Sequence, residues 1–516
     1  QGFSLLLDLA SIHLVWPRLQ LHGVRGATID VTSNEHLHTD GQHLRLQHHY
    51  AAADRIICAH DDIDWMPPHP RGVRYLMVTV RNATQDVTFT GLSLRSASYP
   101  VSHTGSFRCS DTLLNNIWEM CARTQAANME DAYVDCIGRE RGMYGRDTII
   151  QYFVNLATFG DHALMGRCME LYGQSPDSTG KFRAVYPNTG DYTIADFALN
   201  MVEGYWDYYQ HSGDLERVRA DWDAIMNNLQ WFHQLADERR DLLLDAEWHT
   251  KQHVTAHYGG FHGDLTSKGY MSNRGIHCMF SCTYLIALRR AVQLATALGD
   301  RAAARALQSR VTRLARSVRT KFWNPKLKCY SDNLTRDTHS LHASLLAVRA
   351  GAAPRSQWPH LRRHVARELH ALFVNGFDPS AGCKASPNFA FYLFDGLYQL
   401  GLADTAEQFM RQGWGWMLAQ SMQTCAEYFS TTASLCHAWS ASPAYYLSKH
   451  VLGVHYPQAP DCSAVEIRVQ TDSITHAEGA YPHPRGAVRV KWHLERGRRV
   501  FDYVKAPRGV RVKIIS

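Results

Sequence analysis

The residues best suited to chemistry are concentrated in the stretch 131–147. Seven of its seventeen residues are charged, and aromatic and aliphatic residues lie between them. The charged residues are Asp131, Asp135, Arg139, Glu140, Arg141, Arg146 and Asp147. Burying this much charge is costly unless each group is paired or acts on a ligand. The stretch therefore indicates a partly buried polar site. An ion-pair network that ties two helices together is the structural alternative.

Paired carboxylates are what glycoside hydrolysis requires, one acting as an acid and the other as a base or nucleophile. Glu140 is the best candidate for the acid. Asp135 and Asp147 lie close enough in sequence to raise its pKa by repulsion, whereas Arg139 and Arg141 would lower it. The sequence leaves that balance open. A structural pair between Glu140 and an arginine is the alternative.

A second carboxylate lies far along the chain, at Glu427. It is the only acid between Glu407 and Asp461, and an apolar, aromatic run surrounds it. We expect it to partner Glu140, although capping or pairing at a helix end is the alternative. Two further candidates for the site are His437, which is either a site imidazole or a satisfied core histidine, and Trp248, which is either a stacking ring after Glu247 or core.

Other chemistries fit the sequence poorly. There is no His-Glu-x-x-His helix and no Gly-x-Ser-x-Gly elbow. The stretch from Gly173 to Lys181 resembles a phosphate loop only superficially, because six residues separate its glycines and Phe182 stands where a hydroxyl is needed. Histidines 249, 253, 257 and 262 match no common metal spacing. We expect neither a metal nor another cofactor.

Composition narrows the class of partner. A length of 516 residues predicts two to four domains, and a net charge of +6 is too mild to indicate nucleic acid. The 24 Tyr and 13 Trp favour an amphipathic ligand such as carbohydrate. The 12 Cys lack paired spacing, which predicts mostly reduced, packed thiols, and no apolar run is long enough for a membrane span. The start lacks an initiator Met, so we expect it to be processed or truncated. Compartment and oligomeric state stay open.

Hydrophobic periodicity divides the chain into three parts. Residues 1–104 read as strands and predict a small antiparallel β-sandwich, and residues 455–516 return to a period of two and predict a short β module that packs on the rest. Between them, residues 105–454 show about twelve helical patterns. Their spans are 111–127, 147–158, 161–173, 193–211, 214–233, 274–297, 299–321, 338–350, 358–371, 386–400, 403–418 and 439–452.

Twelve helices without a fixed repeat favour a closed ring of six hairpins, an (α/α)6 toroid, over a solenoid. Long links alternate with short ones, as such a ring requires: 128–146, 174–192, 234–273, 372–385 and 419–438. The long links would meet at one mouth. The expected fold class is therefore mainly α with flanking β, and Glu140 and Glu427 both belong to mouth links.

At this point the residues resemble a known family. Asp135, Cys136, Arg139, Glu140 and Arg141, followed by Asp147, match in order and spacing the signature of the inverting α-L-rhamnosidases of glycoside hydrolase family 78. The similarity continues at Tyr99 and 105–118 upstream and at 424–427, 434–439 and 477–486 downstream. It thus spans most of the chain.

The resemblance implies an (α/α)6 catalytic domain between β modules, with no metal in the chemistry. It gives Glu140 the role of general acid and Glu427 that of the base that activates water. It assigns Asp135, Arg139, Asp147 and His437 to the sugar hydroxyls. An inverting pair must leave room for water, with carboxyl groups about 6.5–9.5 Å apart. Tyr144 and Trp248 could cover the methyl group of a 6-deoxy sugar.

Four positions depart from the family pattern. Ile137 replaces the usual Pro, Tyr144 the usual Trp and Arg146 the usual Gly, and Glu247 with Trp248 stands for an Asp-Trp pair. These departures affect the identity of the expected sugar more than the expected type of reaction. The sequence therefore predicts an inverting hydrolase that removes terminal α-L-rhamnose or a close relative from a glycoside or oligosaccharide. A non-catalytic sugar-binding protein and a polysaccharide lyase on the same ring are the alternatives.

Overall fold

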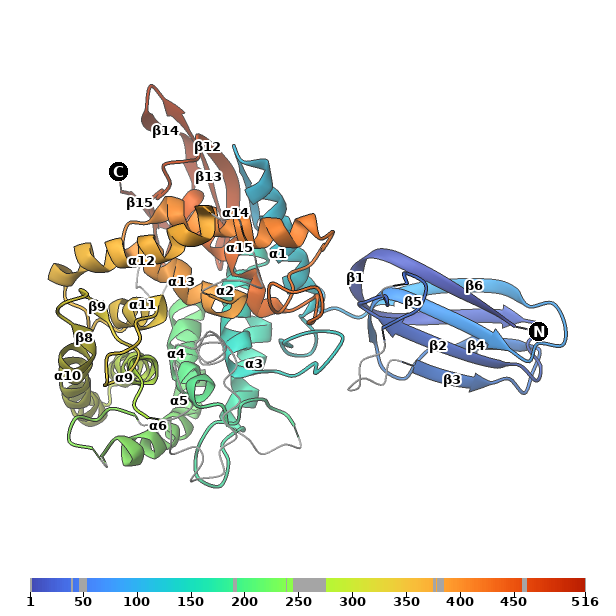
Figure 1. The fold of residues 1–516 in the computed structure, drawn as a ribbon, viewed down its shortest axis with the longest axis horizontal. Helices are drawn as coiled ribbons and strands as arrows, with labels where there is room; N and C mark the ends of the chain where they lie inside the picture. Colours follow the sequence, from blue (N-terminus) through green and yellow to red (C-terminus); the bar gives the residue numbers. More distant parts are fainter. Residues whose placement is uncertain are drawn as a thin grey trace.

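The computed structural model describes residues 2–38, 40–45, 53–188, 193–237, 239–244, 275–374, 377, 385–456 and 462–515. An N-terminal sheet domain lies beside a helical domain, and C-terminal strands pack on another side of the helices (Figure 1). The predicted fold class, mainly α with flanking β, is confirmed.

Six antiparallel strands form the N-terminal sheet domain. They are β1 (Phe3–His22), β2 (Thr28–Asn34), β3 (Ala53–Ile57), β4 (Asp62–Trp65), β5 (Arg71–Arg81) and β6 (Thr88–Ser96). The register of β1 shifts between Asp8 and His13, so that its first part pairs only with β5 and its last part pairs with β6 and β4. Cross-strand pairs such as Ile29 with Val80 fill the core of the domain.

Helices pair into hairpins through the central domain. Their bounds are α1 (Thr112–Ala127), α2 (Gly145–Thr158), α3 (Ala163–Gly173), α4 (Ala195–Ser212), α5 (Leu215–Ala220), α6 (Trp222–Asp237), α9 (Cys278–Leu298), α10 (Arg301–Phe322), α11 (Leu341–Arg349), α12 (Trp358–Val374), α13 (Pro387–Gln399), α14 (Ala403–Ala419) and α15 (Ser442–Tyr446). Short elements complete the domain: β8 (Trp323–Asn324), β9 (Cys329–Tyr330) and the turns η1 (Arg355–Gln357), η2 (Ala438–Ala441) and η3 (Leu447–Val451).

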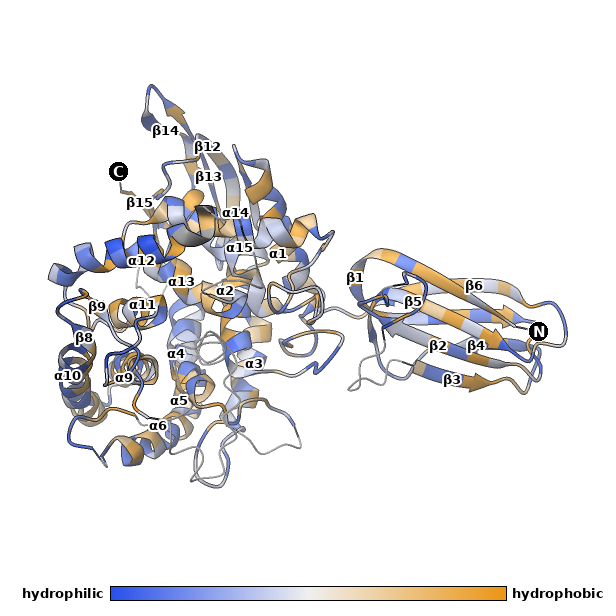
Figure 2. Cartoon of the chain, in the orientation of Figure 1, coloured by the Kyte–Doolittle hydropathy of each residue, from blue (hydrophilic) through white to orange (hydrophobic). Residues whose placement is uncertain are grey.

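Burial separates an inner ring of helices from an outer one. Every residue of α2 is buried, which is the pattern of an inner helix. On α10 only one stripe is buried. Hydrophilic residues make up much of α10 and α12 (Figure 2). The stripe consists of Leu307, Val311, Leu314, Val318 and Phe322. The outer helices thus shield an inner ring whose N-terminal ends can carry a site.

Two predicted helices differ from the observed ones. The span 214–233 is two helices, α5 and α6, which break at Asp221. The Asp221 carboxylate accepts hydrogen bonds from Arg217 at 2.6 Å and from the Tyr205 hydroxyl at 3.0 Å, so a tertiary partner stabilises the break. The span 439–452 is a 3-10 turn, a short α-helix and a π turn in succession.

The C-terminal strands build onto the helical domain. They are β10 (Val454–His455), β11 (Ala464–Ile467), β12 (His476–His483), β13 (Gly486–Glu495), β14 (Arg498–Lys505) and β15 (Arg511–Ile514). One sheet runs in the order β14-β13-β12-β7, and β7 (Ser106–Cys109) directly precedes α1. Trp492 of β13 is fully buried, and it donates a 3.0 Å hydrogen bond to the Val451 carbonyl of η3. The module therefore packs on the helices, as expected.

Two further expectations concern cysteines and membranes. Eleven cysteines fall in the described ranges, and all are buried thiols outside disulfides, which confirms the expectation for them. Within the same ranges, no helix combines the length and apolar character that a bilayer crossing needs.

Replacing Trp492 with Ala should destabilise the protein strongly. The change empties a large buried site and removes the hydrogen bond to Val451, and comparable Trp→Ala changes cost about 3–5 kcal/mol. Urea titration followed by tryptophan fluorescence and circular dichroism measures the effect. Lys491→Ala, at a half-exposed neighbour that pairs with Glu478, is the control and should cost under about 1 kcal/mol. Equal losses in both variants would contradict a Trp492-centred interface.

Candidate active site

Two loops that are distant in sequence lie side by side at one end of the helical domain. The first joins α1 to α2 and contains Asp135, Arg139 and Glu140, with Asp147 just beyond it in the first turn of α2. The second joins α14 to η2 and contains Glu427 and His437. The backbones of Cys136 and His437 form a β-bridge, and the Ala438 amide donates to the Asp135 carbonyl at 3.0 Å. Backbone hydrogen bonds therefore hold both candidate glutamates in one region.

The guanidinium of Arg139 spans the two candidate glutamates. Its Nε donates to the Glu140 carboxylate, and its Nη2 lies 2.8 Å from Oε2 of Glu427. Glu427 is 6% exposed, whereas the Glu140 side chain is about one-third exposed. Both carboxylates thus face one shared group at the edge of solvent. The planar, forked guanidinium is well suited to hold two acids at once.

The balance of charges around Glu140 is decided by Arg139. Burial raises the pKa of Glu140, but the hydrogen bond and positive charge of Arg139 outweigh it and bring the pKa below its ordinary value. Arg141 pairs with Glu130 instead, so it does not act on Glu140 directly. Without a ligand, Glu140 is therefore ionised at neutral pH.

Asp135 is a buried carboxylate that organises its own loop. Its side chain accepts a 2.8 Å hydrogen bond from the Gly142 amide and a 3.2 Å bond from the Cys136 thiol. Burial, with repulsion from Glu140 and Asp147, raises the pKa of Asp135 well above its ordinary value despite the nearby His437. Asp135 therefore closes the loop by accepting the Gly142 amide, and its buried setting favours the neutral acid.

Asp147 and His437 form a buried pair beside the glutamates. His437 Nε2 lies 3.1 Å from Oδ1 of Asp147, in the first turn of α2, and the imidazole packs 4.2 Å from the Trp439 ring. Burial lowers the pKa of His437, but Asp147, Glu427 and Asp135 together raise it to about 9. The ring is therefore a cation at neutral pH. It neutralises part of the surrounding negative charge.

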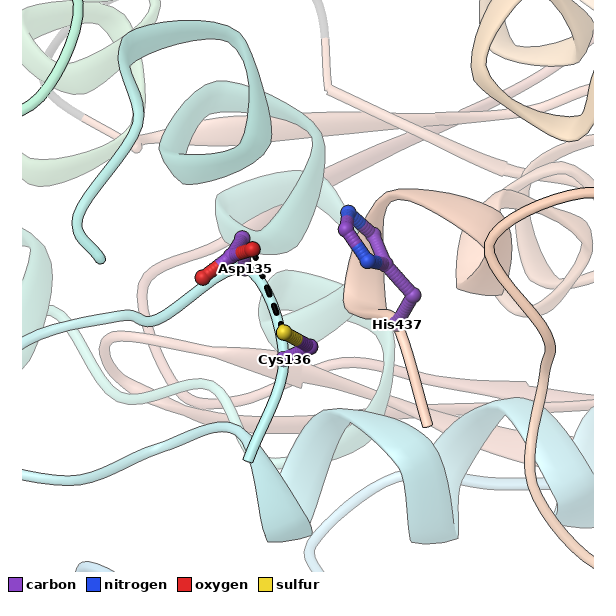
Figure 3. A group of neighbouring side chains, drawn as sticks. All are labelled: Asp135, Cys136 and His437. Atoms are coloured by element: carbon purple, nitrogen blue, oxygen red, sulfur yellow. Dashed lines mark hydrogen bonds between the residues drawn. The ribbon is translucent and has the colours of Figure 1, made fainter. Parts of the chain in front are cut away.

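Asp135, Cys136 and His437 also form the one metal-like grouping in the described ranges (Figure 3). Their donor atoms lie within 4.8 Å of one another. However, the Cys136 thiol donates to both Asp135 and Glu140, and burial raises the pKa of that thiol well above its ordinary value. Metal ligation needs a thiolate and a neutral imidazole. This thiol and the His437 cation fit a network of shared protons better than a metal centre.

The two aromatic candidates have different outcomes. Tyr144 is the N-cap residue of α2, and its partly buried ring meets Phe197 edge-on, with centroids 6.4 Å apart. Trp248 and the neighbouring Glu247 lie outside the described residues. Six predicted site residues come together in one cluster: Asp135, Arg139, Glu140, Asp147, Glu427 and His437.

Sequence reasoning missed a buried ion pair beneath this cluster. Arg146 is fully buried and lies 2.5 Å from Asp196 of α4, with Asn200 at 2.9 Å and the Phe197 ring under the guanidinium. The available signal was the polar pair Asp196 and Asn200, four residues apart and therefore on one face of the helix. This pair joins the N-terminal ends of two inner helices.

Sequence reasoning also missed a carboxylate from the other domain. Glu35, the first residue after β2, is 6% exposed and accepts a 2.7 Å hydrogen bond from the Leu435 amide. Burial raises the pKa of Glu35 to about 7, although the Leu435 amide and Arg139 oppose the shift. No local sequence pattern marks this position, because its partners lie about four hundred residues away.

The protonation of His437 should appear in the pH dependence of stability. In the unfolded chain its pKa is about 6.5, and in the folded chain it is about 9. A pKa raised by folding stabilises the fold fully below pH 6.5, and this contribution is lost as the pH rises through about 9. The free energy of unfolding of the wild type should therefore fall across this window relative to His437→Gln. Urea titrations at a series of pH values measure the difference, and parallel curves would contradict the pairing.

Two family models match this chain. The family model for the bacterial α-L-rhamnosidase six-hairpin glycosidase domain matches residues 102–451, and the model for the concanavalin-like domain of the same enzymes matches residues 2–95. No curated protein sequence matches the chain.

Several solved structures are similar to this chain. A family 78 rhamnosidase of Bacillus sp. GL1 has 26% identity and a TM-score of 0.86, and the match covers 100% of this chain and 53% of that one. The α-L-rhamnosidase of Streptomyces avermitilis complexed with L-rhamnose has 18% identity and a TM-score of 0.78 over 99% of this chain and 48% of that one. A rhamnosidase from Klebsiella oxytoca with rhamnose bound has 20% identity and a TM-score of 0.70 over 87% of each chain.

The chain spans about half the length of the Bacillus and Streptomyces proteins. The six-hairpin model nevertheless covers more than half of this chain, and it agrees with the predicted (α/α)6 toroid. The chain belongs to the bacterial α-L-rhamnosidases of glycoside hydrolase family 78.

Proposed function

We propose that this chain hydrolyses terminal α-L-rhamnosides with inversion, with Glu140 as general acid and Glu427 as general base. The observation that carries the proposal is the single Arg139 guanidinium that contacts both glutamates. Membership of the family supports the same reaction, and two solved relatives hold rhamnose. Inversion needs two carboxyl groups about 6.5–9.5 Å apart, with a water on the face of the sugar opposite the leaving group. The shared contact with Arg139 brings the two carboxylates to the same region without direct contact between them.

The acid must carry a proton before the bond breaks, and in the free protein Arg139 holds Glu140 ionised. The entering sugar therefore has to draw Arg139 away from Glu140. Once that positive charge engages a sugar hydroxyl, burial raises the pKa of Glu140 and favours its protonation. Arg139 then acts as a substrate-dependent switch of the acid. Glu140 gives its proton to the glycosidic oxygen, and Glu427 takes one from the attacking water.

The remaining residues of the cluster suit a hydroxylated sugar. Asp135, Asp147 and the His437 cation offer buried acceptors and a donor, and Arg139 adds a forked donor. The Tyr144 ring suits the methyl group of a 6-deoxy sugar, and we assign Trp248 the same task. Rhamnose presents this combination of hydroxyls and one methyl group.

Glu140→Gln and Glu427→Gln should each lose nearly all turnover of an aryl α-L-rhamnoside while the fold is retained. Neither amide can exchange the proton that its step requires, and such steps contribute about 10²–10⁴-fold. Release of the aryl group measures the rate, and proton NMR of the first product reports the anomer. Wild-type turnover in either variant would remove the mechanism.

Glu130→Gln is a matched control for that experiment. Glu130 lies at the start of the same loop and pairs with Arg141, away from both glutamates. The control should keep its kcat. An unsaturated product that absorbs ultraviolet light would instead indicate a lyase, and binding of L-rhamnose without turnover of any glycoside would indicate a sugar-binding protein.

A further inference from the structure

Glu35 lies between the sheet domain and both catalytic loops. It follows β2 directly, and its Oε2 accepts the Leu435 amide hydrogen at 2.7 Å. The next residue, His36, points Nε2 at the Ala433 carbonyl at 3.0 Å. These two contacts fix residues 433–435 to the N-terminal domain.

The segment that Glu35 fixes is the one that orients Glu427. The Glu427 amide donates to the Ser434 carbonyl at 2.8 Å, and the His437 amide donates to the Cys425 carbonyl at 2.8 Å. The loop is thus a narrow hairpin, with Glu427 on one arm and Ser434 and Leu435 on the other. A shift of Leu435 would move its hydrogen-bonded neighbour Glu427.

The other face of Glu35 rests on the loop that carries Glu140. A Cβ added to Gly138 would collide with Oε1 of Glu35, so the carboxyl group lies directly against that backbone. Gly72 of β5 makes a similar approach, because a Cβ there would lie 2.6 Å from the Ile137 carbonyl oxygen. Oε1 of Glu35 is buried and finds no hydrogen-bond partner among the residues that the structure describes. The carboxyl group therefore fills the space between Gly138 and Leu435.

We propose that Glu35 is a positioning residue that sets the spacing of Glu140 and Glu427 by wedging between their loops. The proposal rests on the proposed function, since it concerns the same two glutamates. Glu35 acts through Leu435 and Gly138 and does not touch the sugar. The N-terminal sheet domain is thereby part of the active site.

The charges that face Glu35 are those of Arg139, His437 and Glu427. They include two cations and one anion, and burial favours the neutral acid. The wedge therefore depends on shape and on one accepted hydrogen bond more than on charge. Glutamine has both properties, so Glu35→Gln is the conservative variant.

Glu35→Ala should lower the kcat for an aryl α-L-rhamnoside by about 10- to 100-fold with a much smaller change in KM, because misplacement of a catalytic group by about 1 Å has such a cost. Glu35→Gln should recover most of the rate. Asp30→Asn removes a carboxylate from the same strand, where it pairs with Arg55 and Arg81, and should leave kcat unchanged. Wild-type kcat in Glu35→Ala, or a loss in Glu35→Gln as large as in Glu35→Ala, would overturn the proposal.

Hydrogen exchange tests the contact between Glu35 and the Glu427 loop independently of catalytic activity. Mass spectrometry of the free protein should show faster amide exchange in the segment 425–437 of Glu35→Ala than of the wild type and Glu35→Gln. If the wild type cleaves no rhamnoside, the proposed function fails, yet this measurement still tests the wedge. Unchanged exchange in Glu35→Ala would overturn the wedge even if the enzyme is active.

A double variant tests the contact with Gly138. Gly138→Ala should lower kcat in the wild type, because the new methyl group collides with Glu35. The same change should cost much less in Glu35→Ala, where the space is free. Additive losses in the double variant would show that the two residues act independently and would overturn the proposal.

Discussion

The structure of the site depends on one guanidinium group between two carboxylates. Arg139 lies on the loop before α2 and holds Glu140 from its own loop and Glu427 from a loop almost three hundred residues away. Two acids this close to each other and to Asp135 would repel strongly without a cation. Arg139 therefore offsets the repulsion between the carboxylates of the two loops, which backbone hydrogen bonds also join. The same contact lowers the pKa of Glu140 and keeps it ionised in the free protein.

Charged side chains of the cluster and of the region next to it are paired with groups of opposite charge. Around the glutamates lie Asp135 and the pair of Asp147 with His437, and beneath them the Arg146–Asp196 pair joins α2 to α4. Each buried charge in this cluster has a partner of opposite sign or a backbone donor. Such partners offset the cost of removing a charge from water. This arrangement explains why the inner helices present their N-terminal ends here. The dipole of a helix favours anions at its N-terminus, where Asp147 lies in α2.

The N-terminal sheet domain also contacts the two loops that carry the cluster. Its strands β2 and β5 end or begin beside residues 137–138 and 433–435 of the two loops. In many enzymes the functional loops are positioned by the scaffold of the domain to which they belong. Here a second domain supports them from outside. Small residues at Gly72 and Gly138 allow the backbones to approach.

The sequence by itself determined the fold class, and it marked six residues that the structure brings together in one cluster. Hydrophobic periodicity is a local property, so the strands around 74–80 and the amphipathic stripe of α10 were predictable. The signature around Glu140 is also contiguous, and the isolation of Glu427 in an apolar run marked it as a candidate. Helix ends and the break at Asp221 were not predictable, because tertiary partners such as Tyr205 stabilise them.

Only the tertiary structure decided how the charges combine. Whether Asp135 or Arg139 governs the pKa of Glu140 depends on distances between side chains, and the direct hydrogen bond from Arg139 decides it. Glu35 and the Arg146–Asp196 pair were missed or left without a role for the same reason. Their partners lie on other elements, and Coulomb and hydrogen-bond energies depend on separation in space, which residue types and spacing along a chain do not encode.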